Sequence, residues 1–182
     1  SAGQRRLLAA LAIARGDTVR AESLGETLGL GGSGLRTALS RLRARIGDDT
    51  ITTNSSGYRI EADIDATRFE HLIAMTNTGT ERLTDLEAAL GLWHGGALDE
   101  FSHEQWAEIE AARLDELALV ATEDRSELLI GLGRSGEAVS VLEALVTANP
   151  HRDRPRGLLL QALSCEGRQA DALRAYHHYR SF

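Results

Sequence analysis

The 182 residues suffice for one large domain or two small ones, and 42% hydrophobic with 26% charged residues is typical of a globular chain. All 20 basic residues are arginine, which excludes P-loop enzymes, Schiff-base enzymes and protein kinases, because each needs a lysine. A single cysteine, Cys165, excludes a disulfide framework and a cysteine zinc site, so a reducing cytoplasmic location is expected. No apolar run approaches the roughly 18 residues of a membrane span, and no membrane contact is expected.

Charge is distributed unevenly along the chain. The net charge is −7, yet residues 1–62 hold 9 arginines against 6 acids, whereas residues 63–182 hold 11 arginines against 21 acids. A basic part joined to an acidic remainder is typical of nucleic-acid-binding proteins, although solvated helix faces can produce the same asymmetry. Near residue 62 short alternating segments also give way to long helical periodicity. We therefore expect two domains, residues 1–62 and residues 63–182.

The first domain begins with helical segments. Residues 4–14 and 21–29 each carry leucines at the spacing of a helix that buries one face. The glycine-rich stretch 31–34 (GGSG) lacks the lysine of a phosphate loop. It is interpreted as a turn in which Ser33 caps the next helix.

Residues 35–46 are the most informative segment. At about 100° per residue, three leucines and an isoleucine form one apolar stripe, and no acid lies on the opposite face. That outward face and one flank carry short or cationic side chains, namely Arg36, Thr37, Ser40, Arg41 and Arg43. Arginine can bond guanine bidentately, and Ser or Thr can reach bases or phosphates, so the helix suits the major groove of DNA. The alternative is a solvated arginine-rich helix, which would usually include glutamate for pairing.

Two short strands follow this helix. Residues 50–53 and 57–61 have strand character, and the polar residues 54–56 (NSS) join them as a hairpin. Three helices followed by a hairpin form a winged helix-turn-helix. The tip is small and polar and is flanked by Arg59, which suits contact with a phosphate backbone or a minor groove.

A family resemblance rests on the segments 39–47 (LSRLRARIG), 51–53 (ITT) and 57–60 (GYRI). In order and spacing they resemble the LSRLRxxLG, IxT and GYRL pattern of OmpR-type winged helices. The resemblance assigns DNA contact to Thr37, Ser40, Arg41 and Arg43, and a place near the DNA backbone to Thr53, Asn54, Ser55 and Arg59. It also implies that Tyr58 packs the wing onto the core. The family's small N-terminal sheet has no counterpart before the first helix of this chain.

Residues 63–182 have helical periodicity almost throughout, and the last fifty contain a repeat. Seven positions align at an offset of 34: Leu129, Gly133, Arg134, Glu137, Ala138, Val139 and Leu142 with Leu163, Gly167, Arg168, Asp171, Ala172, Leu173 and Tyr176. This is the tetratricopeptide period, in which each helix pair buries its apolar face against its neighbours. Before the repeat, one long helix is expected to bury Trp106 and Ile109 on the same side. Cys165 is expected to be buried in a helix.

A second resemblance covers this half of the chain. The segments 88–98 (AALGLWHGGAL), 110–117 (EAARLDEL), 142–146 (LEALV) and 167–176 (GRQADALRAY) resemble the bacterial transcriptional activator domain. That domain follows an OmpR-type winged helix in SARP-type (antibiotic regulatory protein) activators. The resemblance implies an activator that binds direct repeats near promoters and engages RNA polymerase and its sigma factor. The expected fold is therefore mainly α, with a winged helix followed by tetratricopeptide-like repeats, and the repeat domain is expected to be truncated at its C-terminus.

No enzyme, metal site or cofactor site is expected. The six histidines do not have the spacing of a metal site, and no nucleophile with a base and an orienting residue can be assembled. Two functions stay open. The first is a transcriptional regulator that binds double-stranded DNA and RNA polymerase, as a homodimer or as protomers side by side on DNA. The second is a protein-interaction adaptor in which the winged helix and the repeats dock protein partners without binding DNA.

Overall fold

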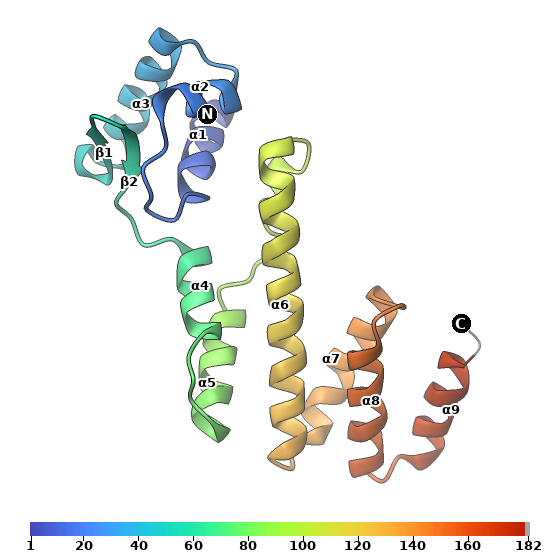
Figure 1. The fold of residues 1–182 in the computed structure, drawn as a ribbon. Helices are drawn as coiled ribbons and strands as arrows, with labels where there is room; N and C mark the ends of the chain where they lie inside the picture. The colour runs from blue at the N-terminus through green and yellow to red at the C-terminus, as the bar shows by residue number, and fades with distance from the viewer. Residues whose placement is uncertain (181–182) are drawn as a thin grey trace. The chain divides into compact units, whose positions relative to one another are not determined.

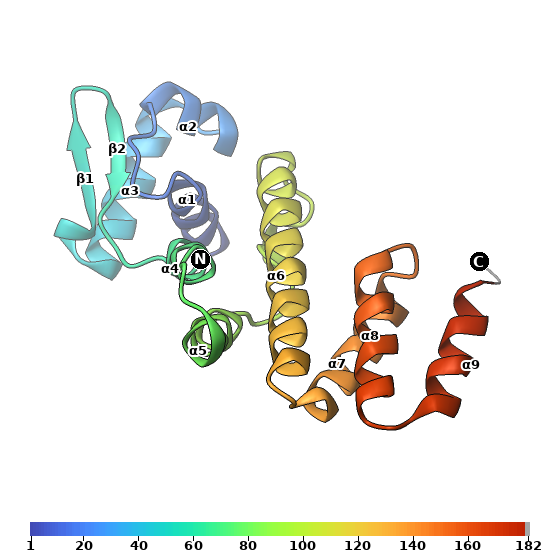
Figure 2. The ribbon, with the colours of Figure 1, turned by 60° about the horizontal axis from the view of Figure 1, so that its bottom comes forward.

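The computed structural model describes residues 1–180, which are mainly helical and contain one two-stranded antiparallel sheet (Figures 1 and 2). In chain order, the elements are α1 (Ala2–Ala12), α2 (Ala21–Leu28), α3 (Gly32–Ile46), η1 (Asp48–Thr50), β1 (Ile51–Asn54), β2 (Gly57–Ile60), α4 (Asp65–Ile73), α5 (Gly79–Leu90), η2 (Asp99–Phe101), α6 (Gln105–Gly131), α7 (Ser135–Ala148), α8 (Asp153–Cys165) and α9 (Gln169–Tyr179). The mainly α fold with a small hairpin is therefore confirmed.

Packing divides the chain into two compact units. The N-terminal unit consists of residues 1–68 and 94–115, and the repeat unit consists of residues 69–93 and 116–182. The division passes through α4 and α6. It differs from the boundary expected near residue 62, because residues 94–115 pack with the helices that begin the chain.

The core of the N-terminal unit lies between α1, α2, α3 and the hairpin. The leucine stripe expected on the third helix is buried, and it meets leucines of α1 and α2 and an isoleucine from each strand. The helix starts earlier than expected, at Gly32, with Gly31 in extended conformation before it. The expected cap by Ser33 is wrong: this residue is already helical, so its side chain is misplaced for capping.

The hairpin is close to the expected one. Ile51 pairs with Ile60 and Asn54 pairs with Gly57, so that only two residues form the turn. The side-chain oxygen of Asn54, Oδ1, accepts hydrogen bonds from the backbone N–H groups of Ser56 and Gly57 at 2.8 and 3.0 Å. This side chain therefore holds the turn that the polar tip requires.

A third extended segment joins the sheet edge. Val19 and Tyr58 exchange backbone hydrogen bonds of 2.8 and 2.9 Å, and the bridge is antiparallel. Gly57 has φ +153°, and a Cβ there would lie 2.0 Å from the Val19 carbonyl oxygen. Only glycine fits this approach. Tyr58 packs against the helical core, as expected.

Residues 94–115 cover a second face of α1. Phe101 and Ala107 are buried against Ala9, with Leu98 and Trp106 beside them. Three ion pairs surround this apolar contact: Arg5 with Glu100 at 2.5 Å, Arg6 with Glu104 at 2.7 Å, and Arg15 with Glu110. Acids from residues 94–115 therefore neutralise Arg5 and Arg6 of α1 and Arg15 just after it.

The 34-residue repeat is visible in the backbone. α6 and α8 end at Gly131 and Cys165, and α7 and α9 begin at Ser135 and Gln169, each pair of boundaries being 34 residues apart. Between each pair of helices a glycine with positive φ turns the chain, Gly133 at +74° and Gly167 at +70°. The next residue, Arg134 or Arg168, donates its backbone N–H to a leucine carbonyl five residues earlier at 2.8 Å.

The two copies of the repeat differ in burial. In the first copy, Ala138 and Leu142 are both fully buried in a cluster with leucines of α8. In the second copy, Tyr176, the counterpart of Leu142, is 46% exposed. Leu173, the counterpart of the buried Val139, is likewise exposed. No described element covers that face of α9, so the apolar residues of the second copy lie at the surface.

Two expectations about burial are wrong. Ile109 is 80% exposed because α6 buries the side marked by Ala107 and Leu114, from which Ile109 points away. Cys165 is exposed because it is the last residue of α8, next to the turn. Trp106, expected on the same side of the helix as Ile109, is half-buried and contacts Phe101, with ring centroids 5.6 Å apart.

Candidate nucleic-acid interface

The outward face of α3 is exposed as the sequence predicts. Arg36, Thr37, Ser40 and Arg41 are all exposed, while the leucines on the opposite side are buried. Within the described residues, neither Arg36 nor Arg41 forms an ion pair with a carboxylate. Thr37 donates its hydroxyl to the Ser33 carbonyl at 3.0 Å, which leaves its oxygen lone pairs available. This face can therefore present two charged forks and two hydroxyl groups to a ligand.

Arg43 lies differently from the other arginines of the predicted site. It is half-buried, and its guanidinium donates to the Ile51 carbonyl oxygen through Nε at 2.8 Å and a terminal nitrogen at 2.7 Å. The same terminal nitrogen also donates to Thr53 Oγ1 at 2.7 Å. A direct hydrogen bond therefore joins Arg43 and Thr53, two of the predicted site residues. The sequence contains a signal for this, because Arg43 lies nearer to the leucine stripe than Arg36 or Arg41 does.

The remaining predicted residues lie on the hairpin. Ser55 is exposed in the two-residue turn, while the Asn54 amide nitrogen donates to Thr18 Oγ1 at 3.0 Å. Arg59 lies on β2 and pairs with Glu61 at 3.0 Å. Both side chains are exposed, so this pair is weak and can exchange for another anion. Sequence reasoning missed Thr18, whose short segment has no strand periodicity.

Within residues 1–180, ion pairs neutralise several arginines of the N-terminal unit and leave those of α3 unpaired. The arginines of α1 and of the turn after it pair with acids of residues 94–115, whereas Arg36 and Arg41 of α3 are exposed to solvent. Arg45, on the other flank of α3, donates to the Gln4 side chain at 3.3 Å and carries no paired acid among the described residues. Charge that is not cancelled by a neighbour attracts phosphate most strongly, so α3 is the most cationic element available.

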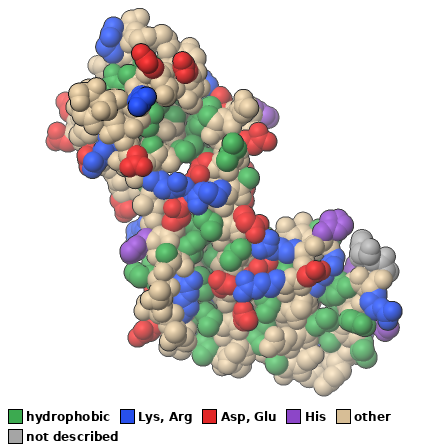
Figure 3. Space-filling view, viewed as in Figure 1, with side chains coloured by type: hydrophobic (Ala, Val, Ile, Leu, Met, Phe, Trp, Pro, Cys, Tyr) green, Lys and Arg blue, Asp and Glu red, His purple; other side chains and the backbone are tan. Residues whose placement is uncertain are grey.

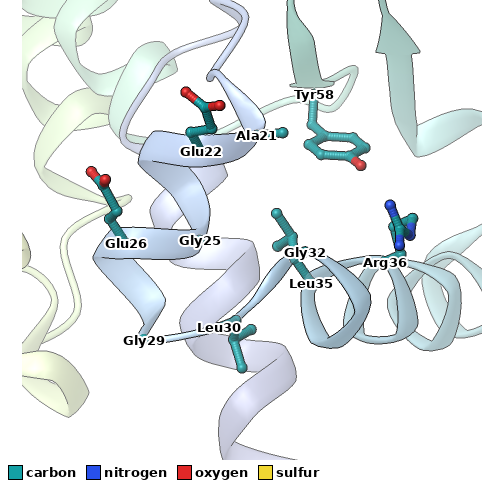
Figure 4. Close-up of a pocket in the computed structure, with 10 residues that line it drawn as sticks. All are labelled: Ala21, Glu22, Gly25, Glu26, Gly29, Leu30, Gly32, Leu35, Arg36 and Tyr58. Carbon is teal, nitrogen blue, oxygen red and sulfur yellow. The ribbon is translucent and has the colours of Figure 1, made fainter.

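An open hollow of about 480 Å³ lies between α2, α3 and β2 (Figure 4). Glu22 and Glu26 line its α2 side, Arg36 lines its α3 side, and the Tyr58 ring points toward α3. The leucines Leu30 and Leu35 supply apolar surface. Because two carboxylates lie on α2, that helix is a poor neighbour for phosphate, and the α3 side of the hollow is the cationic one.

The repeat unit has a different electrostatic character. On the face shown in Figure 3, arginine and acidic side chains are interleaved over the helical repeats. Arg134 pairs with Glu137 at 2.6 Å, and Arg168 pairs with Asp171 at the same distance one repeat later. Hydrogen bonding to these arginines lowers the pKa of the Glu137 carboxyl and the pKa of the Asp171 carboxyl. The repeat unit therefore offers few unpaired cations for DNA.

Residues 1–180 hold no group of three or more His, Cys, Asp or Glu side chains placed to bind a metal ion. Their helices include none with both the length and the apolar character needed to cross a membrane.

Comparison with known proteins identifies the family. Residues 64–182 match the bacterial transcriptional activator domain. The regulatory protein AfsR of Streptomyces griseus is 36% identical over 95% of this chain, and the transcriptional regulator RedD of Streptomyces coelicolor is 33% identical over 66% of it. The structure of Mycobacterium tuberculosis EmbR in complex with a low-affinity phosphopeptide matches 100% of the chain, with a TM-score of 0.86 and 28% identity.

The relatives are longer than this chain. The match spans 19% of AfsR, 37% of RedD and 53% of the EmbR chain. Regulatory protein DnrI of Streptomyces peucetius matches as well, at 30% identity over 79% of the chain. The chain therefore belongs to the SARP-type family of transcriptional regulators and carries the bacterial transcriptional activator domain.

Proposed function

We propose that this protein is a transcriptional regulator that binds double-stranded DNA sequence-specifically through a winged helix-turn-helix in residues 1–62. The observation that carries the proposal is the exposed, acid-free face of α3, formed by Arg36, Thr37, Ser40 and Arg41 above a buried leucine stripe. In this arrangement α3 lies in the major groove, where the arginine forks bond guanine edges and the hydroxyl groups reach bases or phosphates.

The hairpin acts as the wing. Ser55 at its tip and Arg59 on β2 are exposed, and a small polar tip can approach a phosphate backbone or a minor groove closely. Thr53 and Asn54 precede the tip on β1: Thr53 accepts a hydrogen bond from Arg43, and the Asn54 side chain holds the turn. Phosphate contacts of this kind position the protein, while contacts from α3 read the sequence.

The acidic helical repeats of residues 63–182 contact proteins. This chain carries the bacterial transcriptional activator domain, and its relatives are named regulatory proteins and transcriptional regulators, which supports a role in transcription regulation. In the proposal, activation proceeds through RNA polymerase and its sigma factor at direct repeats near promoters. Stacked helix pairs present extended surfaces suited to such contacts. Two protomers bound side by side would occupy a direct repeat.

The experiment is selection of duplex sites by the purified protein, followed by titration of the best site at several salt concentrations. We expect log K to fall linearly with log salt, with a slope of about −0.9 for each phosphate neutralised. Arg41→Ala should weaken the selected site by about 1 to 3 kcal/mol and relax selectivity at one base pair.

Arg134→Ala is the matched control. It removes the same charge from an exposed arginine of the repeat unit that is paired with Glu137, so DNA affinity should stay close to that of the wild type. An equal loss in both variants would show that only net charge matters. Absence of duplex binding at low salt would refute the proposal and favour the adaptor function, in which both units dock proteins.

A further inference from the structure

The guanidinium of Arg43 is a physical link between α3 and the hairpin. It makes three hydrogen bonds of 2.7 to 2.8 Å, two to the carbonyl oxygen of Ile51 and one to Thr53 Oγ1. Ile51 is buried at the start of β1, and Arg43 is half-buried one turn before the end of α3. We call this arrangement of Arg43, Ile51 and Thr53 the clasp.

The clasp occupies the outer edge of β1. The Glu61 N–H donates to the Thr50 carbonyl at 2.7 Å, so the alternation of an antiparallel pair makes Ile51 and Ile60 a pair that is not hydrogen-bonded across the hairpin. The Ile51 carbonyl therefore points away from β2 and has no partner in the hairpin. Arg43 satisfies it, and an orphaned carbonyl at this edge would be costly.

The opposite edge of the hairpin is held in the same way. Tyr58 belongs to the next pair of this type, and its outward N–H and carbonyl groups bond Val19. The strand pair is thus anchored on both sides, to α3 through Arg43 and to the segment before α2 through Val19. A two-stranded hairpin is marginal by itself, so these anchors determine where it lies.

We infer that Arg43 is a positioning residue for DNA recognition: the clasp fixes the hairpin against α3 and thereby sets the distance between the two DNA-contacting elements. The inference rests on the proposed function, and it changes the role expected for Arg43 from DNA contact to alignment of the wing. With the clasp closed, α3 in the major groove and the tip at Ser55 bind one continuous half-site of fixed length.

Lysine distinguishes the two roles. A phosphate contact depends on charge, which lysine keeps, whereas two bonds that converge on one carbonyl oxygen and a third to a hydroxyl need the planar fork of arginine. Arg43→Lys therefore preserves net charge and removes the clasp geometry. Thr53→Val removes a single acceptor and leaves both bonds to Ile51, so it provides a milder perturbation of the same clasp.

The first measurement is amide hydrogen exchange of residues 51–60 in the DNA-free protein, followed by NMR. Arg43→Lys should accelerate exchange in the hairpin by about tenfold and Thr53→Val by about threefold, because fewer bonds hold the strand pair. Arg41→Lys is the control on the same helix: its side chain has no bond to the hairpin among the described residues, so exchange there should match the wild type.

The second measurement is DNA binding with hydroxyl-radical footprinting on the selected site. Arg43→Lys should lose the protection given by the wing, keep the protection given by α3, and weaken binding about tenfold. The double variant Arg43→Lys with Thr53→Val should bind no worse than Arg43→Lys alone, because both changes open one clasp.

Wild-type exchange and affinity in Arg43→Lys would overturn the inference and return Arg43 to a charge contact. Faster exchange with an unchanged footprint would also overturn it, since alignment would then not serve DNA binding. If Arg43→Lys does not fold, Thr53→Val carries the same test with smaller effects. Failure of the wild type to bind any duplex would refute the proposed function instead, and the exchange measurement would still report whether the clasp holds the hairpin.

Discussion

Glu123 gives the sharpest test of how the repeat unit is held together. It lies on α6 and is 1% exposed, and its carboxylate faces two arginines from the start of α8. Arg152 bonds both of its oxygens, and Arg154 approaches at 3.4 Å. We predict that Glu123→Gln destabilises the protein, because the amide keeps the shape but removes the charge that these guanidinium groups face.

The magnitude follows from what remains after the change. Removing one member of a fully buried ion pair costs about 3 to 5 kcal/mol. Here Arg152 keeps Glu116 at 2.7 Å, and Arg154 keeps Asp124 and Glu127 at 2.6 and 2.7 Å, so neither cation is left alone. Loss of charge-assisted hydrogen bonds then dominates, and we expect about 2 kcal/mol.

The assay is urea denaturation monitored by circular dichroism, with a thermal melt in parallel. A loss of about 2 kcal/mol should lower the midpoint of the thermal melt by roughly 4 to 8 °C for a chain of this length. Glu127→Gln is the matched control: it makes the same change at a 61% exposed partner of Arg154 and should cost less than about 0.5 kcal/mol. An equal loss of unfolding free energy in the two variants would refute the reasoning, because burial of the carboxylate would then have no effect on stability.

Three further predictions concern glycine positions and one surface ion pair. Gly57→Ala should destabilise the N-terminal unit by about 3 kcal/mol or more, since its Cβ would overlap a carbonyl; wild-type midpoints in urea would contradict this. Gly133→Ala, at φ +74°, should cost about 1 kcal/mol, whereas Gly157→Ala inside α8 has open space and should stabilise by about 0.5 to 1 kcal/mol. Urea midpoints that shift in the same direction for both glycine variants would contradict these two predictions. The pKa of Glu137 is lowered by hydrogen bonding to Arg134, so its contribution to stability is present above its ordinary value of 4.5 and is lost as the pH falls through the lowered value. Glu137→Gln should therefore show less acid destabilisation between about pH 6 and about pH 3, and an unchanged acid limb would contradict the assignment.

The sequence determined the local features of this protein. The stripe of Leu35, Leu39 and Leu42 fixed which face of α3 is buried, and the same periodicity left Ser40 and Arg41 outside. The offset of 34 residues located both repeat turns, because a helix pair of constant length places its glycines at a constant interval. Such features depend on neighbours within a few residues, which is why periodicity and turn chemistry reveal them.

Tertiary structure decided which charges are free and what each one does. Arg5, Arg6 and Arg15 belong to the same basic N-terminal part of the sequence as the arginines of α3, yet acids about 95 residues later pair with them. Arg43 belongs to the same basic motif as Arg41 and turns instead toward β1, while Ile109 has the expected period but falls on the exposed side of α6. An ion pair forms only where the fold brings two side chains within a few ångströms, and sequence spacing does not contain that distance. The sequence alone thus determined the helices, the hairpin and the repeat, and packing between distant segments decided which arginines form ion pairs and which stay exposed on α3.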